Sequence, residues 1–183
     1  MEYHLGHHGS AVRNDGESML NAFFRKQPKK GVPPSAEAAP EVPYDPSLVA
    51  ALTHQHRELV MLLVKAHSAA QQGRYEEVRG TLQQFKDELV VHLRKEHDEL
   101  QDYLSGHLKG ADAKDLLKEM RANSSYIERA VDSFLNHYLN YPVTERTAMR
   151  FGIEISGVSE EFCERVERAE GSFYTLYMPP ETY

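Results

Sequence analysis

The sequence predicts an all-α protein, an antiparallel up-down-up-down four-helix bundle. Apolar residues recur every three or four positions through most of the chain, which is the spacing that places them on one face of an α-helix. No stretch alternates between apolar and polar residues over the length of a strand, so strands are not expected. Short breaks divide the pattern into four long segments, and long helices with short connections pack side by side in alternating directions. The segments are 46–72, 75–105, 112–140 and 144–177.

The first two expected helices have recognisable ends. Asp45-Pro46 is typical of an N-cap followed by proline in the first turn, and Gly73 ends the first segment. The second segment stops at Ser105-Gly106. Their apolar stripes are Leu52, Leu59, Leu63 and Ala66, and then Leu82, Phe85, Leu89, Leu100 and Tyr103.

The last two expected helices end at proline. Tyr141-Pro142 closes the third, because the residue before proline disfavours helical backbone, and Met178-Pro179-Pro180 closes the fourth. The bundle domain is therefore expected over 46–178, with a C-terminal tail at 179–183. The apolar stripes are Leu116, Met120, Ile127, Val131, Phe134 and Tyr138, and then Phe151, Ile155, Val158, Phe162, Ala169, Phe173 and Leu176.

Residues 1–45 differ from the rest and are expected to form a flexible, Pro-rich N-terminal extension. Five prolines lie in the stretch 27–43, which therefore cannot be helical and has few large apolar groups for a core. The segment Met19–Lys26 has both apolar and basic residues. We interpret it as frayed chain in preference to an amphipathic anchor for a membrane surface or a partner.

Composition excludes several classes of protein. Of 183 residues, 40% are hydrophobic, which is enough to build a core. The formal net charge of -7 disfavours direct nucleic-acid binding, since binders of this kind need a basic face. Cys163 is the only cysteine, so an intrachain disulfide is excluded and a Cys-rich zinc site is not expected. No apolar run approaches the length of a membrane span and no signal-peptide pattern begins the chain, so a cytoplasmic protein is expected.

Five polar residues interrupt the apolar stripes: His56, His92, Glu96, Ser124 and Arg165. Burying a polar or charged group without a partner costs several kcal/mol, so these side chains should meet one another, an ion or water. His92 and Glu96 are four residues apart and share one helix face. That spacing suits two ligands of a single metal, and His56 on the neighbouring helix can complete a set suited to iron, zinc or manganese.

These residues also carry a resemblance to a known family. Thr53-His-Gln-His56-Arg-Glu-Leu59, His92-Leu-Arg-Lys-Glu96-His97 and Glu164-Arg-Val-Glu-Arg-Ala-Glu170 are similar to the hemerythrin-like (HHE cation-binding) domain. The resemblance covers about 46–178 and implies a four-helix bundle with a non-haem di-iron centre. It implies that His56, His92 and Glu96 are metal ligands.

At the family's other ligand positions, this sequence has residues that do not match the family's metal ligands. The third-helix histidine position falls close to Ser124, and the fourth-helix histidine and acidic positions fall close to Arg165 and Ala169. The cofactor is thus one or two non-haem iron ions, or none. One hypothesis is a metal-free layer in which Arg165 pairs with Glu96 and replaces the metal's charge.

The other hypothesis keeps one metal on the three matched ligands, with His54, His97 or Glu170 as a supplementary ligand. His97 lies about 140° around the helix from His92, so it needs a different neighbour or a second site.

A second resemblance indicates a different class of function. Leu89–Glu99 and Cys163–Glu170 are similar in pattern to the Rsd/AlgQ anti-sigma regulators. This resemblance implies a metal-free bundle that binds a sigma factor or another protein of the transcription or signalling machinery. The net negative charge suits a basic partner surface.

The sequence therefore predicts a bacterial, cytoplasmic regulator in preference to an enzyme. The first interpretation is a hemerythrin-like sensor of oxygen, iron or redox state with a reduced metal site. The alternatives are the metal-free protein-binding regulator and a conventional non-haem iron protein for oxygen or nitric oxide. No phosphate-binding loop or nucleophile elbow is found. The oligomeric state stays open.

Overall fold

The computed structural model describes residues 42–183, except the side chains of residues 111–114, 123–124 and 126–127. This part of the chain is helical and contains no strand. The predicted N-terminal extension lies almost wholly outside the described residues. The elements are α2 (Leu48–Gln71), α3 (Tyr75–Lys95), η1 (Glu96–Gln101), α4 (Asp102–His107), α5 (Ala111–Asn140), α6 (Ala148–Arg168), η2 (Ala169–Phe173), η3 (Tyr174–Leu176) and η4 (Pro180–Thr182).

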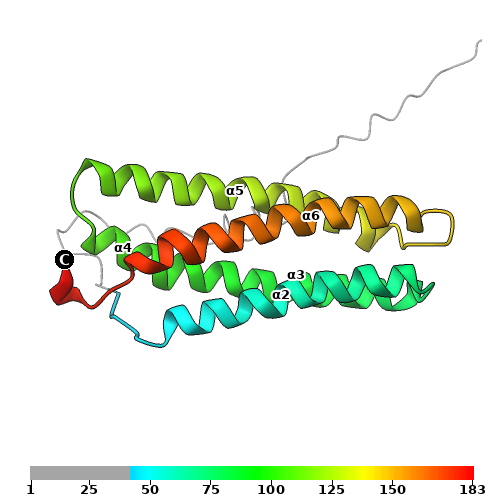
Figure 1. Ribbon diagram of the computed structural model, residues 1–183, viewed down its shortest axis with the longest axis horizontal. Coiled ribbons are helices and arrows are strands. Elements are labelled where there is room, and N and C mark those ends of the chain that lie inside the picture. Colours follow the sequence, from blue (N-terminus) through cyan, green and yellow to red (C-terminus); the bar gives the residue numbers. More distant parts are fainter. Residues whose placement is uncertain (1–41) are drawn as a thin grey trace, which may run out of the picture.

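The long helices lie side by side and form a bundle (Figure 1). α2 packs against α3 and α6, α3 packs against α5, and α5 packs against α6, so each long helix has two neighbours. Consecutive long helices run in opposite directions along the bundle (Figure 1). Gly73 allows the tight turn between α2 and α3, because its φ of 72° is a backbone conformation that favours glycine.

Two apolar clusters fill the interior. The larger, here called the large core, includes Leu63, Phe85, Phe151 and Phe162, all at most 1% exposed. The smaller, here called the end core, lies near the start of α2 and includes Leu48, Leu52, Leu100, Tyr103, Leu104, Phe173, Tyr174 and Tyr177. His56, Glu96 and Arg165 fall between residues of the two clusters along α2, η1 and α6, and His92 lies one turn before Glu96.

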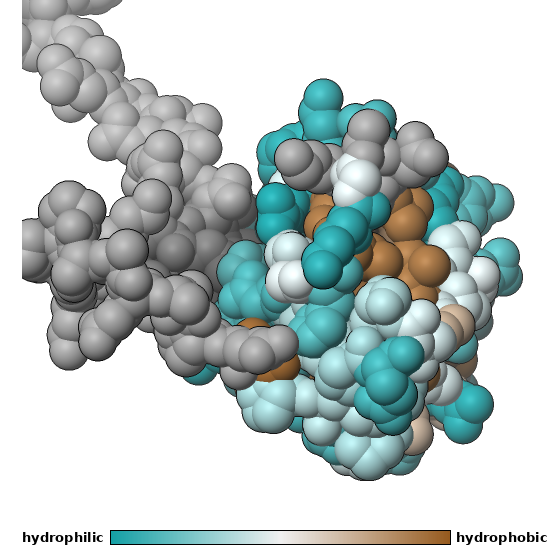
Figure 2. Space-filling view, turned by 90° about the vertical axis from the view of Figure 1, so that its left-hand side faces the viewer, coloured by the Kyte–Doolittle hydropathy of each residue, from teal (hydrophilic) through white to brown (hydrophobic). Residues whose placement is uncertain are grey.

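The end of the bundle near the C-terminal segment is shown in Figure 2. Its outer surface is mostly hydrophilic, with hydrophobic residues grouped in the middle of that face. No helix among the described residues is both long and apolar enough to cross a membrane.

The predicted helices are present, but two change geometry inside their predicted range. The predicted helix 75–105 is interrupted by η1, a π-helix, and continues as α4. The predicted helix 144–177 starts later, at Ala148, because Thr147 closes a turn onto Thr144. It then passes through the π-helix η2 and the 3-10 helix η3. A spacing of three and four residues does not reveal a single wider turn, so the sequence could not predict these changes.

Candidate metal centre

The structure brings His56, His92 and Glu96 together between the two apolar cores. His56 comes from α2, His92 from the last turn of α3, and Glu96 from the first position of η1. All three side chains are buried, and one ligand atom from each lies within 4.8 Å of the others. The i and i+4 spacing stacks His92 above Glu96 on one helix face, as expected.

His92 is oriented by one hydrogen bond and keeps one ring nitrogen without a partner. Its Nδ1 lies 3.2 Å from Oε1 of Gln55, and because that oxygen can only accept, Nδ1 carries the proton. Its Nε2 is buried and has no hydrogen-bond partner among the described residues. Burial lowers the pKa of His92 to about 3. The imidazole is therefore neutral, with the Nε2 lone pair available.

His56 lies beside His92, with ring centroids 4.5 Å apart. Its Nδ1 is 2.9 Å from Oε1 of Glu170, and its Nε2 is 3.3 Å from the hydroxyl of Tyr174. Burial lowers the pKa of His56, while the hydrogen bond to Glu170 acts in the opposite direction. Both histidines are therefore held neutral by burial and oriented by a neighbouring side chain.

Glu96 is held as a carboxylate by two donors. Its Oε2 forms a buried ion pair with Nη2 of Arg165, which comes from α6. Its Oε1 accepts a hydrogen bond of 3.2 Å from the hydroxyl of Tyr174. Burial, the largest influence, raises the pKa of Glu96, but the charge and hydrogen bond of Arg165 together with the interactions with His92 and His56 bring the pKa below its ordinary value. The Arg165–Glu96 pairing expected from the sequence is present.

Tyr174 connects the polar layer to the end core. Its ring lies nearly parallel to that of His56, at 6° and 5.6 Å, and packs within the end core. Burial, followed by the negative charge of Glu96, raises the pKa of Tyr174, so its phenol stays protonated and donates. Nothing in the sequence indicated that its hydroxyl reaches the histidines.

Of the three supplementary ligands and the replacing group, Arg165, that the sequence predicted, the structure brings two to the centre. Glu170 contacts His56, and Arg165 contacts Glu96. His54 is exposed and lies 3.9 Å from Glu58. His97 is exposed and contacts Asp98, so it points away from the buried layer, as its position around the helix predicts.

On the fourth helical segment, the acidic side chain that reaches the layer is Glu170, one residue after Ala169. The family's acidic position was expected close to Ala169, which packs in the end core, whereas Glu170 faces His56. The π-helix η2 is the reason, because its wider turn delays the inward face by one residue. The Ser124 side chain lies outside the described residues.

Two residues near the centre were not identified from the sequence. Gln55 orients His92, and its only sequence signal is its place beside His56. Glu128 of α5 is half-buried and interacts electrostatically with Arg165 and Glu96, and burial raises its pKa. It lies four residues after Ser124, a spacing that places both on one helix face.

These residues have the donors and the spacing to hold a metal ion. Nδ1 of each histidine is hydrogen-bonded to a side-chain oxygen, the outer arrangement that orients imidazoles bound to metals. Ligands at about 2.1 Å from one ion lie at most about 4.2 Å apart, so small side-chain rotations would close the 4.8 Å cluster. The Arg165 guanidinium is paired with Glu96 and is a fixed positive charge beside the cluster, which repels cations.

The fold and this cluster define a class of protein, a helical bundle with a buried His/Glu group that can hold a cation. The hemerythrin HHE cation-binding domain matches residues 47–177, which is most of the chain. The chain therefore belongs to the hemerythrin HHE cation-binding domain family, in which metal ions, typically iron, are bound. Neither the curated proteins nor the solved structures give a match to this chain.

Proposed function

We propose that this chain binds a single metal ion, with non-haem iron as the first candidate, and acts as a sensor or regulator instead of an enzyme. The ligands would be Nε2 of His56, Nε2 of His92 and a carboxylate oxygen of Glu96. The observation that carries the proposal is the buried Nε2 of His92, which has no hydrogen-bond partner among the described residues. A bound ion gives that lone pair a partner.

Two further residues would tune the bound ion. Glu170, 35% exposed, accepts from Nδ1 of His56 and so would raise the basicity of that ligand. Tyr174 would keep its hydrogen bond to Glu96. When bound, iron would supply redox and ligand-binding chemistry, and the changes in charge at this layer would be felt by Arg165 and the helices that carry it.

Metal analysis of the untagged full chain tests the proposal. His4, His7 and His8 are replaced by Ala in every sample, so that metal on these residues does not contribute. We expect one ion per chain in this background and none after His92→Ala. His54→Ala is the matched control, because His54 is an exposed histidine on α2, and it should keep the ion.

Each other outcome has a definite meaning. Two irons per chain would contradict the single-ion site and restore a conventional oxygen- or nitric-oxide-binding centre. Metal retained after His92→Ala would place the ion elsewhere. No metal in a folded protein from iron-supplemented cells would support the second candidate function.

The second candidate is a metal-free regulator that binds a protein partner such as a sigma factor. The buried Arg165–Glu96 ion pair favours it, because a fixed guanidinium already supplies positive charge to the carboxylate. A pull-down with a sigma factor, compared with a charge-matched bait protein, tests this function. Equal capture by both baits would argue against it.

A further inference from the structure

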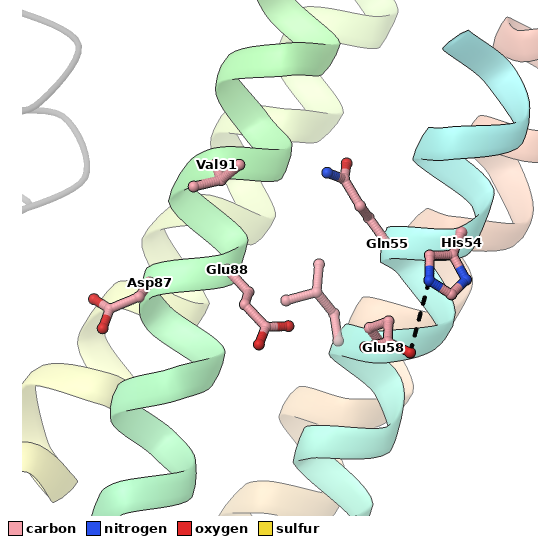
Figure 3. Close-up of a pocket in the computed structure, with 7 residues that line it drawn as sticks. His54, Gln55, Glu58, Asp87, Glu88 and Val91 are labelled. Carbon is pink, nitrogen blue, oxygen red and sulfur yellow. Dashed lines mark ion pairs between the residues drawn. The ribbon is translucent and has the colours of Figure 1, made fainter. Parts of the chain in front are cut away.

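A groove lies between α2 and α3, on the outer side of the metal centre. It encloses about 400 Å³. Figure 3 shows that the side chains of Gln55 and Glu88 point into the space between the two helices. The residues that line the groove are His54, Gln55, Glu58, Leu59, Asp87, Glu88 and Val91.

The groove combines carboxylates with apolar surface. Glu58, Asp87 and Glu88 line it, and none of the lining residues is Lys or Arg. The hydrogen bonds of Asp87 and Glu88 are to neutral glutamine side chains on the same helix, at 2.9 Å and 2.8 Å. Val91 is 59% exposed although it is a large apolar side chain. This chemistry fits an occupant with apolar and positively charged side chains next to each other.

The chain itself contains such an occupant. Met19–Lys30 reads Met-Leu-Asn-Ala-Phe-Phe-Arg-Lys-Gln-Pro-Lys-Lys, with two phenylalanines followed by four basic residues and no acidic residue. Its charge is opposite to that of the groove, and its phenylalanines match the exposed apolar surface. A second hollow, near His67 and Met149, has no carboxylate in its lining and lies near the far end of α2.

The connecting residues are long enough to reach. The described chain begins at Val42, which packs against the end core near the start of α2. The groove lies around Glu58, ten residues along α2 from Leu48, which is about 15 Å at 1.5 Å per residue. Residues 31–41 can span about 34 Å at about 3.1 Å per residue in an extended, Pro-rich conformation.

We infer that Met19–Lys30 docks in the groove between α2 and α3 of its own chain. The basic side chains pair with Glu58, Asp87 and Glu88, and Phe23 or Phe24 covers Val91. Docking also covers Gln55, which both lines the groove and accepts the hydrogen bond from His92. The N-terminal segment is thereby connected to the polar layer through one side chain. This inference is independent of whether the centre holds a metal.

Chymotrypsin cleavage of the full chain tests the docking. Cleavage after Phe24 reports on the docked segment, and cleavage after Tyr3 is an internal reference outside it. A segment docked about 90% of the time is cleaved about tenfold more slowly than a free one. In a variant with Glu58→Gln, Asp87→Asn and Glu88→Gln, cleavage after Phe24 should speed up about tenfold while cleavage after Tyr3 is unchanged.

A matched control keeps the test specific to the groove. Glu119, Glu145 and Glu160 are exposed acidic residues elsewhere on the bundle. Changing these three to glutamine removes the same net charge and should leave the slow cleavage after Phe24 as it is. Equal cleavage rates after Phe24 in the wild type and both triple variants would overturn the inference.

Zero-length carbodiimide cross-linking then identifies the contact. We expect Lys26, Lys29 or Lys30 to couple to a groove carboxylate in a product with the mass of one chain. Cross-links found only in a product with the mass of two chains would assign the groove to a second copy and contradict docking within one chain. Cross-links to carboxylates elsewhere would place the segment on another surface.

Discussion

The two parts of the bundle on either side of the polar layer are built in different ways. Toward Gly73, regular α-helices surround the large core, where Phe85 and Phe162 meet edge to face at 5.8 Å. At and beyond the polar layer toward the C-terminus, the second and fourth helical segments both turn into π-helices, η1 and η2. π-Helical turns are rare and are frequently found at functional sites. The comparison indicates that the regular part supplies stability and the irregular part presents chemical groups.

The two parts differ because apolar side chains and polar side chains have different requirements when they are buried. Each buried leucine or phenylalanine of the large core contributes about 1.5–3 kcal/mol without any directional requirement. The polar layer instead needs hydrogen-bond or ion-pair partners for its polar atoms, because an unsatisfied buried charge costs several kcal/mol, and Nε2 of His92 is the atom that still lacks one among the described residues. Hydrogen bonds form only when donor and acceptor face each other, so they depend on helix register. The π-helix η2 sets the register that brings both Glu170 and Tyr174 to His56.

The largest effect in this comparison is expected from Arg165→Ala. The change leaves the Glu96 carboxylate buried without its ion-pair partner, which costs about 3–5 kcal/mol in the free energy of unfolding. Urea unfolding followed by circular dichroism measures this loss. Adding Glu96→Leu to Arg165→Met removes both charges and should recover most of the stability, since apolar pairs replace buried ion pairs well. An Arg165→Ala protein as stable as the wild type would show that the pair is not structural.

A smaller effect is expected from pH in the metal-free protein. The pKa of His92 is 6.5 in the unfolded chain and about 3 in the fold, so the unfolded chain binds the extra proton first as pH falls. The stability from this group is complete above pH 6.5 and decreases as pH falls toward 3. Between pH 7 and pH 4.5 the free energy of unfolding should fall by about 2–3 kcal/mol from His92 alone.

Urea unfolding at a series of pH values checks this dependence. His56, whose pKa is also lowered, acts in the same direction. The variant His92→Gln does not titrate, so its stability should fall less steeply over the same pH range. A wild type and a variant with parallel pH dependence would contradict the neutral, buried state of His92.

The smallest effect is expected from Tyr174→Phe. The change removes the hydroxyl that lies 3.2 Å from Glu96 and 3.3 Å from His56, while both of these groups stay buried. The free energy of unfolding should therefore fall by about 1–2 kcal/mol. Tyr138→Phe is the matched control, because that buried tyrosine donates at 2.7 Å to Glu154 outside the polar layer. Glu154 also pairs with Arg150 and can turn to water, so we expect a loss of about 0.5 kcal/mol. Thermal unfolding measures the stability of both variants. Equal losses of stability would mean that the hydroxyl in the polar layer contributes no more than one outside it.

Much of the fold could be predicted because apolar spacing and proline positions are local signals. The same spacing marked His56, His92, Glu96 and Arg165 as buried polar residues, and the structure places these four in one layer. Their role as metal ligands stays a prediction. Gln55 and Tyr174 could not be predicted, since contact with a histidine depends on helix rotation and on the turn at η2, which no local pattern encodes.

The π-helix η2 decides which side chains of the last segment can reach the polar layer. A π-turn holds one residue more than the α-helical turn it replaces, so it shifts the register of all residues that follow it. Deleting one residue within Ala169–Phe173 would return the segment to α-helical register and rotate everything after it by about 100°. The phenol of Tyr174 would then swing away from the histidines. Among related sequences, a one-residue gap at this place should mark those whose fourth helix presents a different set of groups.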